Sequence, residues 1–335
     1  MILVLIETDQ DGASSLSREA LTFARQLSGT APAAGGPDPV GVVHAVVLGD
    51  YPASVLADLA AHGVAVVHHG DDPRLNDYAA AAWAAALAGV VAGLAPAAVL
   101  AAGSPRGNEV LAHLAARLAL PMAANCVSVE GDPAASPLVL HRQVIGGAAL
   151  EELELASSPA LLTVAGHVLE AAPAAAASSP QVQPFAPVLT DADLVGRVRR
   201  VEAVAAGGDS LTKARVVVGV GRGVGAADRF DPMLELARRL GGAIGVSRVV
   251  TSLGWRPHHE QVGQTGTRIA PEVYLACGIS GAIQHWAGCS GAKTIIAVNT
   301  DADAPMVTKA HYAVIGDLHE IIPAINAELT ARGYA

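Results

Sequence analysis

The sequence has few cysteines, the residues that stabilise small secreted proteins through disulfides and small domains through bound metal ions. Only three cysteines occur in 335 residues, Cys126, Cys277 and Cys289, and no two of them form a Cys-x-x-Cys pair. An odd number of widely spaced thiols argues against a disulfide framework, an iron–sulfur cluster and a structural zinc site. This usage is typical of a reducing compartment, and we expect the protein to be cytoplasmic.

Positive charge is also scarce. Lysine and arginine total 21 against 31 acidic residues, giving a formal net charge of −10, and no basic run stands out. Nucleic-acid and anionic-membrane surfaces need clustered cations, so both partner classes are disfavoured. The apolar start of the chain lacks the cationic region of a signal peptide, and Pro96 interrupts the alanine-rich stretch 76–102. We therefore expect neither secretion nor membrane insertion.

The histidine pattern does not predict a metal site. The two adjacent pairs, His68-His69 and His258-His259, lack an i, i+4 partner on a helix and a nearby carboxylate pattern. Neighbouring side chains on a strand point to opposite faces, so the members of such a pair diverge. We expect no metal.

Apolar runs of strand length alternate with amphipathic stretches of helix length, and 52% of the residues are apolar. This alternation is typical of parallel sheets covered by helices. In the first half we expect strands at 2–7, 40–48, 64–68 and 97–101 and helices at 14–28, 52–61, 73–93 and 107–119. After Pro121 the runs shorten, and we expect antiparallel strands at 123–129, 138–144, 148–156 and 160–164.

A second α/β unit is predicted from Arg215 onward, with strands at 215–220, 243–250, 273–277 and 293–298 and helices at 231–240, 281–289 and 318–330. The alanine-, proline- and serine-rich segment 166–190 is expected to be a linker or a segment draped over the first unit. The fold class is therefore α/β with two domains, each a mainly parallel sheet flanked by helices. We expect an N-terminal domain at 1–190, a linker at 191–212 and a C-terminal domain at 213–335.

Glycine and polar residues gather where the strands of the second unit end. The strand 215–220 runs into Gly219-Val-Gly-Arg222-Gly-Val-Gly225, in which backbone N–H groups can approach a ligand and Arg222 can bind phosphate. Ser280 in Gly278-Ile-Ser-Gly is expected to cap a helix whose free N–H groups favour an anion. Ligands of open α/β sheets bind at the carboxyl ends of the strands. Further polar loops at 261–266, 299–303 and 316–318 therefore favour a large nucleotide cofactor.

Two other classes of site fit less well, and two alternatives remain. The third glycine of a dinucleotide fingerprint would fall on Val224, which disfavours a nicotinamide site. The Gly278–Ala282 segment lacks the second glycine of a nucleophile elbow, which disfavours a hydrolase. A non-redox adenine-nucleotide-binding regulatory module remains an alternative, as does a dehydrogenase acting on its own substrate, although no general base other than His285 is evident.

The block PEVYLACGISGAIQHWAGCSGAKTIIAVNTDADAPMVTKAHYAVIGDLHEIIPAI at 271–325 closely resembles the C-terminal signature of electron transfer flavoprotein alpha subunits. The preceding GVGRG, IGVSR and QVGQTG match that family in the same order, and GSPRGNEVLAHLAARLALP resembles its N-terminal domain. The resemblance implies a Rossmann-like C-terminal domain that binds FAD, and an N-terminal domain that docks a beta subunit carrying AMP. It implies a heterodimeric electron carrier rather than an enzyme with its own substrate.

The resemblance also implies the residues that line the cofactor. They are Arg222, Ser247, Arg248, Val262, Gly263, Gln264, Thr265, Ser280, Gly281, Ala282, Ile283, Gln284, His285, Asn299, Asp317 and Leu318. Within this set, Arg248, Thr265 and His285 are implied to tune the flavin, with the Thr265 hydroxyl close to the ring atom N5. The implied role is single-electron relay from dehydrogenases, the acyl-CoA dehydrogenases of fatty acid β-oxidation being the usual donors, to an acceptor such as a quinone oxidoreductase.

Overall fold

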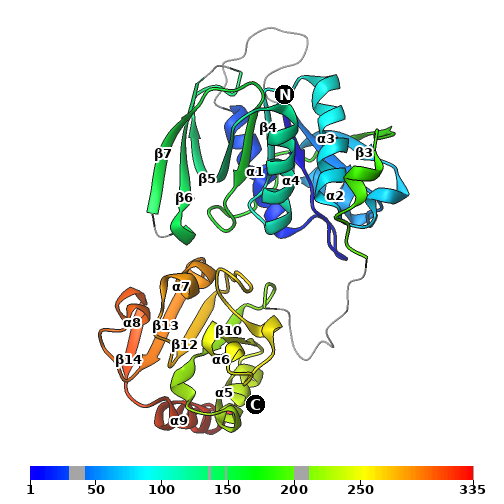
Figure 1. Ribbon diagram of the computed structural model, residues 1–335. Coiled ribbons are helices and arrows are strands. Elements are labelled where there is room, and N and C mark those ends of the chain that lie inside the picture. The colour runs from blue at the N-terminus through cyan, green and yellow to red at the C-terminus, as the bar shows by residue number, and fades with distance from the viewer. Residues whose placement is uncertain (30–41, 135–136, 148, 200–210, 335) are drawn as a thin grey trace. The chain divides into compact units, whose positions relative to one another are not determined.

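A computed structural model of the protein describes residues 1–29, 42–134, 137–147, 149–199 and 211–334. The described residues form two compact units, the first within residues 1–199 and the second from residue 211 onward. Each unit is a mainly parallel sheet flanked by helices, so the predicted α/β class is confirmed (Figure 1). Within the described residues, no helix is both long enough and apolar enough to cross a membrane.

The first unit is built on a nine-stranded sheet with the order β7-β6-β5-β8-β4-β1-β2-β3-β9. The pairs that involve β1 to β4, β8 and β9 are parallel, whereas β6 is antiparallel to both of its neighbours. The strands are β1 (Ile2–Leu5), β2 (Val43–Leu48), β3 (Val64–Gly70), β4 (Ala98–Ala102), β5 (Met122–Glu130), β6 (Leu138–Val144), β7 (Ala149–Leu155), β8 (Ala160–Val164) and β9 (Gln181–Phe185).

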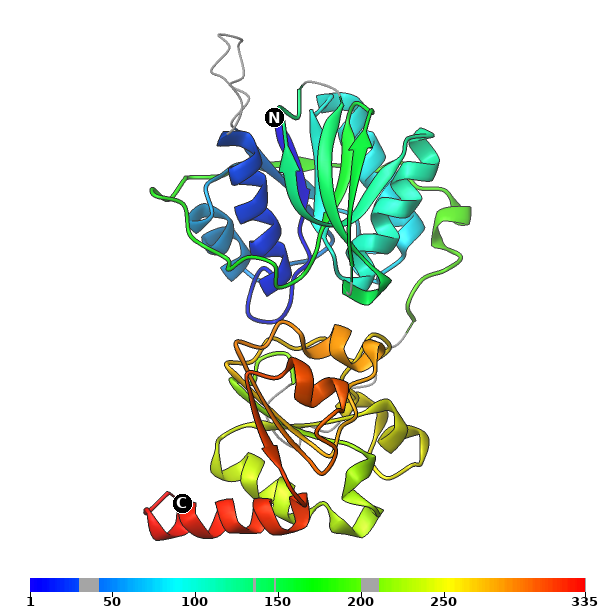
Figure 2. The same cartoon turned by 90° about the vertical axis from the view of Figure 1, so that its left-hand side faces the viewer.

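Helices cover both faces of this sheet. Helices α1 (Ser15–Gly29) and α2 (Ser54–Ala61) pack on one face, and α3 (Ala80–Leu94) and α4 (Pro105–Leu118) pack on the other (Figure 2). The central strands β1 and β4 are buried along their whole length, which explains why their sequences are continuous apolar runs rather than alternating ones.

Two predictions for the first unit are corrected by the structure. The strand at 160–164 is parallel rather than antiparallel, because β8 inserts between β4 and β5. The helix predicted at 73–93 begins only at Ala80, after a short 3-10 turn at Pro73–Leu75. The segment 166–190, predicted to be a linker or a draped segment, contains the edge strand β9, which pairs with β3. Residues 40–41 of the predicted second strand and 200–210 of the predicted linker lie outside the described residues.

The second unit has a five-stranded parallel sheet with the order β11-β10-β12-β13-β14. Its strands are β10 (Val216–Val220), β11 (Ala243–Val246), β12 (Val273–Cys277), β13 (Thr294–Asn299) and β14 (Tyr312–Ile315). One face packs against α5 (Asp231–Arg239), α6 (Arg248–Ser252) and α9 (Leu318–Ala331), and the other against α7 (Ile283–Cys289) and α8 (Pro305–Lys309).

Two predictions for the second unit are wrong in detail. The strand predicted at 243–250 ends at Val246, and Arg248 starts the short helix α6 instead. Ser280 is not a helix cap, because α7 begins at Ile283 and its N-cap is Ala282. As a result β11 is shorter than predicted, and the irregular backbone between β12 and α7 continues to Ala282.

Candidate functional site

The carboxyl ends of four neighbouring strands meet at one edge of the second sheet. Val220 of β10 lies opposite Val246 of β11 and Cys277 of β12, and Cys277 lies opposite Val298 of β13. The loops that follow these strands therefore start at the same level. They enclose a cavity of about 450 Å³, within the range of small-molecule and cofactor sites.

Glycines let these loops approach one another closely. Gly278 and Gly281 have φ angles of +61° and +80°, which residues other than glycine rarely adopt. A Cβ on Gly278 would lie 2.8 Å from the Cα of Gly223, and one on Gly281 would lie 2.4 Å from the backbone nitrogen of Met306. Glycine at these two positions therefore lets the loops that enclose the cavity pack tightly against one another.

The loop from Gln261 to Thr267 closes another side of the cavity and is fixed by backbone hydrogen bonds. Val262 N–H donates to Val246 O at 2.9 Å, which attaches the loop to the end of β11. Gln264 N–H donates to Gln284 O at 2.7 Å, which attaches the same loop to the start of α7. The loop thus bridges two loops that come from different strands.

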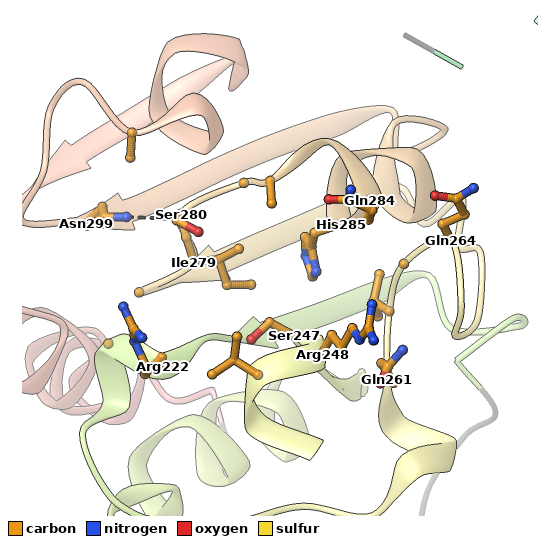
Figure 3. A pocket seen from close by; sticks show the side chains of 18 of the residues that line it. Arg222, Ser247, Arg248, Gln261, Gln264, Ile279, Ser280, Gln284, His285 and Asn299 are labelled. Atoms are coloured by element: carbon orange, nitrogen blue, oxygen red, sulfur yellow. Dashed lines mark hydrogen bonds between the residues drawn. The ribbon is translucent and has the colours of Figure 1, made fainter. Parts of the chain in front are cut away.

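Two arginines project into the site from the opposite side to α7. Arg222 follows β10, and Arg248 is the first residue of α6, after β11 (Figure 3). Both line the cavity together with one acidic residue, Asp301, which follows β13. Guanidinium groups bind phosphate through paired donors and stack on flat rings. Two of them in one cavity favour an anionic ligand.

His285 lies on α7 and is 7% exposed. Its Nε2 atom lies 2.7 Å from the hydroxyl oxygen of Tyr274, which is fully buried beneath the cavity. Burial lowers the pKa of His285 to about 4 and raises the pKa of Tyr274 well above its usual value. Both groups are therefore neutral at physiological pH, and the tyrosine donates to Nε2.

This pairing determines the tautomer of the histidine. Because Nε2 accepts a hydrogen bond, the ring hydrogen of neutral His285 is on Nδ1. Within the described part of the chain that buried Nδ1 atom has no partner at full hydrogen-bond geometry, although the backbone of Val262 lies near enough to offset part of the lowering of the pKa of His285. Buried donors are almost always paired in native proteins, so the cavity calls for a ligand that presents an acceptor to His285.

Most of the residues implied to line a cofactor come together around this one cavity. They are Arg222, Ser247, Arg248, Val262, Gly263, Gln264, Thr265, Ser280, Gly281, Ala282, Gln284, His285 and Asn299. Three others do not line it. Ile283 is partly exposed on α7, Asp317 accepts from His319 N–H as the N-cap of α9, and Leu318 is buried in the core beneath the sheet.

Seven residues that sequence reasoning did not assign also line the cavity: Gly223, Val249, Gln261, Gly278, Ile279, Asp301 and Ala304. Gln261 belongs to the polar loop that the sequence singles out, and Gly278 ends a predicted strand, so their positions carried a signal. Nothing in the sequence indicated that Val249 lines the cavity, because its segment resembled a strand. Asp301 belongs to the polar loop 299–303 that the sequence also singles out, although only Asn299 of that loop was assigned.

The twin histidines are placed away from any metal-like cluster. His68 lies 3.0 Å from the ring nitrogen of His44, and His69 Nε2 lies 3.0 Å from the carbonyl oxygen of Gly49. His258 lies beside a smaller hollow next to Arg248. Among the described residues, no group of three or more His, Cys, Asp or Glu side chains is arranged to hold a metal ion.

Comparison with known sequences covers both units. Residues 2–189 match a family model described as the electron transfer flavoprotein domain, and residues 210–290 match one described as the electron transfer flavoprotein FAD-binding domain. The chain is 35% identical over 333 residues to the electron transfer flavoprotein subunit alpha of Mycobacterium leprae, covering 98% of each chain. Identity to the same subunit of Mycobacterium tuberculosis is 36%, covering 99% and 98%, and to that of Bacillus subtilis 30%, covering 98% and 96%.

Proposed function

The chain belongs to the electron transfer flavoprotein alpha subunit family, and on this basis we propose that its second unit binds one FAD and relays single electrons. The electrons come from dehydrogenases, with acyl-CoA dehydrogenases as the donor class. They pass to an acceptor such as a quinone oxidoreductase. The observation that carries the proposal is the convergence of glycine backbone, two guanidinium groups and an unpaired buried imidazole donor on one cavity.

The residues present suit FAD in three respects. Gly278 and Gly281 let the loops that enclose the cavity pack closely against Gly223 and Met306, which fixes the walls of the cavity. Arg222 supplies a forked donor suited to a phosphate. The Nδ1–H of His285 supplies a donor for a ring carbonyl oxygen, and a flavin ring presents such oxygens. FAD when bound would supply reversible one- and two-electron redox chemistry, while the protein supplies orientation and electrostatics.

Arg248 is the residue proposed to set the redox potential. Its guanidinium group would stabilise the negative charge that reduction adds to the cavity. Two opposite unit charges about 4 Å apart at an effective dielectric constant of 20 attract by roughly 4 kcal/mol. A one-electron potential changes by about 59 mV for each 1.4 kcal/mol, so the upper limit is on the order of 170 mV.

The first unit is proposed to dock the partner beta subunit, which would carry AMP. The relatives are named as alpha subunits, which supports a heterodimer. The proposed division of labour assigns the cofactor to the second unit, where the cavity lies, and the partner contact to the first.

The test is to purify the chain with its beta subunit, add FAD and record the absorption spectrum. A yellow complex with protein-bound flavin bands is expected. A complex that stays colourless would contradict the proposal, and binding of an adenine nucleotide without flavin would favour a regulatory module instead.

The Arg248→Ala variant tests the electrostatic role. We expect it to keep FAD and to lower the first one-electron potential by tens of millivolts in a spectroelectrochemical titration. Arg238→Ala is the matched control, because Arg238 is an exposed arginine on α5 and does not line the cavity. An unchanged potential in Arg248→Ala would refute the role.

A further inference from the structure

A chain of three side chains links helix α6 to the cavity. The Thr251 hydroxyl oxygen on α6 lies 2.7 Å from Gln261 Oε1, and Gln261 Nε2 lies 3.0 Å from the Thr265 hydroxyl oxygen. Gln261 is 3% exposed, so its amide is buried between the two threonines. Thr265 lines the cavity, whereas Thr251 does not.

The Thr251 hydroxyl has two possible acceptors for its one hydrogen. The Thr251 hydroxyl oxygen lies 2.7 Å from Gln261 Oε1 and 2.9 Å from the carbonyl oxygen of Arg248. A hydroxyl carries a single hydrogen and two lone pairs. Thr251 can therefore donate to Gln261, or donate to Arg248 O and accept from Gln261.

Both orientations of the Gln261 amide are consequently satisfied. In one, Thr251 donates to Oε1, Nε2 donates to Thr265, and the Thr265 hydrogen is directed toward the cavity. In the other, the amide is turned over, Nε2 donates to Thr251, Thr265 donates to Oε1, and a lone pair of Thr265 faces the cavity. An amide can exchange its oxygen and nitrogen positions in this way without altering its shape.

We propose that Gln261 is a positioning residue that switches Thr265 between donating to and accepting from the cofactor. The inference rests on the proposed function and on the family resemblance, which implies that the Thr265 hydroxyl lies close to N5 of the flavin. N5 accepts a hydrogen bond in oxidised flavin, and carries a hydrogen once two electrons from the reductant and one proton from solvent have been added. The relay thus presents a matching partner in both redox states.

The main chain of Gln261 is held on both sides, so a change of its hydrogen bonding is confined to the side chain. Gln261 N–H donates to His258 O at 3.0 Å, and Gln261 O accepts from Thr267 N–H at 2.7 Å, so the main chain is fixed on both sides. The smaller hollow beside Arg248 is lined by Thr251, Gln261 and Thr265. It has a volume of about 370 Å³ and borders the three side chains that would reorient.

A double-mutant cycle on the purified heterodimer tests the relay. At pH 8 the carboxylate of Gln261→Glu can only accept, so Thr265 must donate to it and present its lone pair to the cavity. We measure the two-electron potential of bound FAD in wild type, Gln261→Glu, Thr265→Val and the double variant. The charge added by Gln261→Glu acts both with Thr265 and with Thr265→Val, so its direct effect cancels in the cycle. The remaining difference in potential is the effect transmitted through the Thr265 hydroxyl.

We expect the Thr265 hydroxyl to change the ratio of the affinities for oxidised and for reduced FAD by about tenfold. For a two-electron couple this change equals about 30 mV. The change in potential caused by Gln261→Glu should therefore be more positive in the wild-type background than in the Thr265→Val background. Gln264→Glu is the matched control, because Gln264 also lines the cavity but makes no side-chain bond to Thr265 among the interactions of the described residues. Its cycle with Thr265→Val should be additive.

Infrared spectroscopy supplies a second readout. With ¹³C-labelled glutamine, the oxidised-minus-reduced difference spectrum should contain an amide carbonyl band that Gln261→Glu removes. A yellow wild-type complex with an additive cycle and no such band would overturn the relay but leave FAD binding intact. A wild-type complex that binds no flavin would overturn both.

Discussion

At the scale of single residues, the Tyr274–His285 pair sets the donor that faces the cavity. The tyrosine hydroxyl lies 2.7 Å from Nε2, and its own space exists because Gly219 has no Cβ, which would lie 2.2 Å from that hydroxyl. A glycine in the middle of β10 therefore has a structural purpose that is separate from ligand binding.

Replacing Tyr274 with phenylalanine removes the donor to Nε2. We expect that the ring hydrogen of neutral His285 is then no longer restricted to Nδ1. The Nδ1–H population falls, so the affinity for FAD should fall by about three- to tenfold, the equivalent of one neutral hydrogen bond. Flavin fluorescence titration measures the affinity, and ¹⁵N spectra of the imidazole report the tautomer. Tyr312→Phe, at an exposed position on β14, is the control. Unchanged spectra and affinity would disprove the coupling.

Glu7 offers a residue-scale prediction in the first unit. Its carboxylate accepts from the Ser104 hydroxyl at the start of α4, and burial raises its pKa above 4.5 despite that bond and the nearby Arg106. An acid with a raised folded-state pKa binds its proton more tightly when folded. It therefore destabilises the folded state above that pKa, and this penalty disappears as the pH falls below 4.5.

Glu7→Gln keeps an oxygen that can accept from Ser104 and removes the charge. We expect a higher free energy of unfolding than wild type at pH 7, because a tenfold difference in proton affinity between the folded and unfolded states corresponds to about 1.4 kcal/mol. The two proteins should converge near pH 4. Urea unfolding at several pH values, followed by circular dichroism, measures the difference. A gain that is independent of pH would show that ionisation of Glu7 is not the cause.

At the scale of elements, the loop between β12 and α7 depends on the left-handed backbone of Gly281. An alanine there would meet the backbone nitrogen of Met306 at 2.4 Å and would also have a positive φ of +80°. The conformation alone costs about 1–2 kcal/mol, and the clash adds to it. The loop must shift to relieve both.

Gly281→Ala is thus expected to lower the affinity for FAD by at least tenfold while the sheet core remains folded. Gly291→Ala is a suitable control, because Gly291 lies at the far end of α7 and does not line the cavity. Thermal unfolding measures the fold, and the flavin absorbance after gel filtration measures retention of the cofactor. Full retention in Gly281→Ala would show that this loop tolerates displacement.

The elements that sequence patterns predicted well are those whose burial is uniform. Strands β10, β12 and β13 are continuous apolar runs because both of their faces are covered, and each lies within one residue of its predicted bounds. The runs at 123–129 and 138–144 were also placed correctly. What those runs could not reveal was pairing, since β8 joins the parallel part of the sheet through contacts that are distant in sequence.

The same reasoning explains why the segment after β11 was predicted as a strand. Val249 and Val250 extend an apolar run, but Val250 is buried in the core by α6 rather than by β11, and a short run does not distinguish the two. Asp317 and Leu318 follow the end of β14, where Asp317 caps α9 and Leu318 anchors that helix in the core. Their contact with the cofactor stays a prediction.

At the scale of the whole molecule, the candidate site and its support belong to one of the two units. All residues that line the cavity fall between Arg222 and Ala304. The two cores beneath it, one on each face of the sheet, are formed from buried residues between Leu211 and Ile322. A chain of this length is sufficient to bury a core of its own.

We therefore expect a chain from Leu211 to Ala335 to fold and to bind FAD with an affinity within about tenfold of that of the full-length protein. The physical reason is that neither core nor cavity wall draws a residue from the first unit. Circular dichroism measures folding, and flavin absorbance after dialysis measures binding. A folded but colourless fragment would mean that the first unit or the partner subunit supplies part of the binding energy. An unfolded fragment would mean that the two cores need support from outside this region.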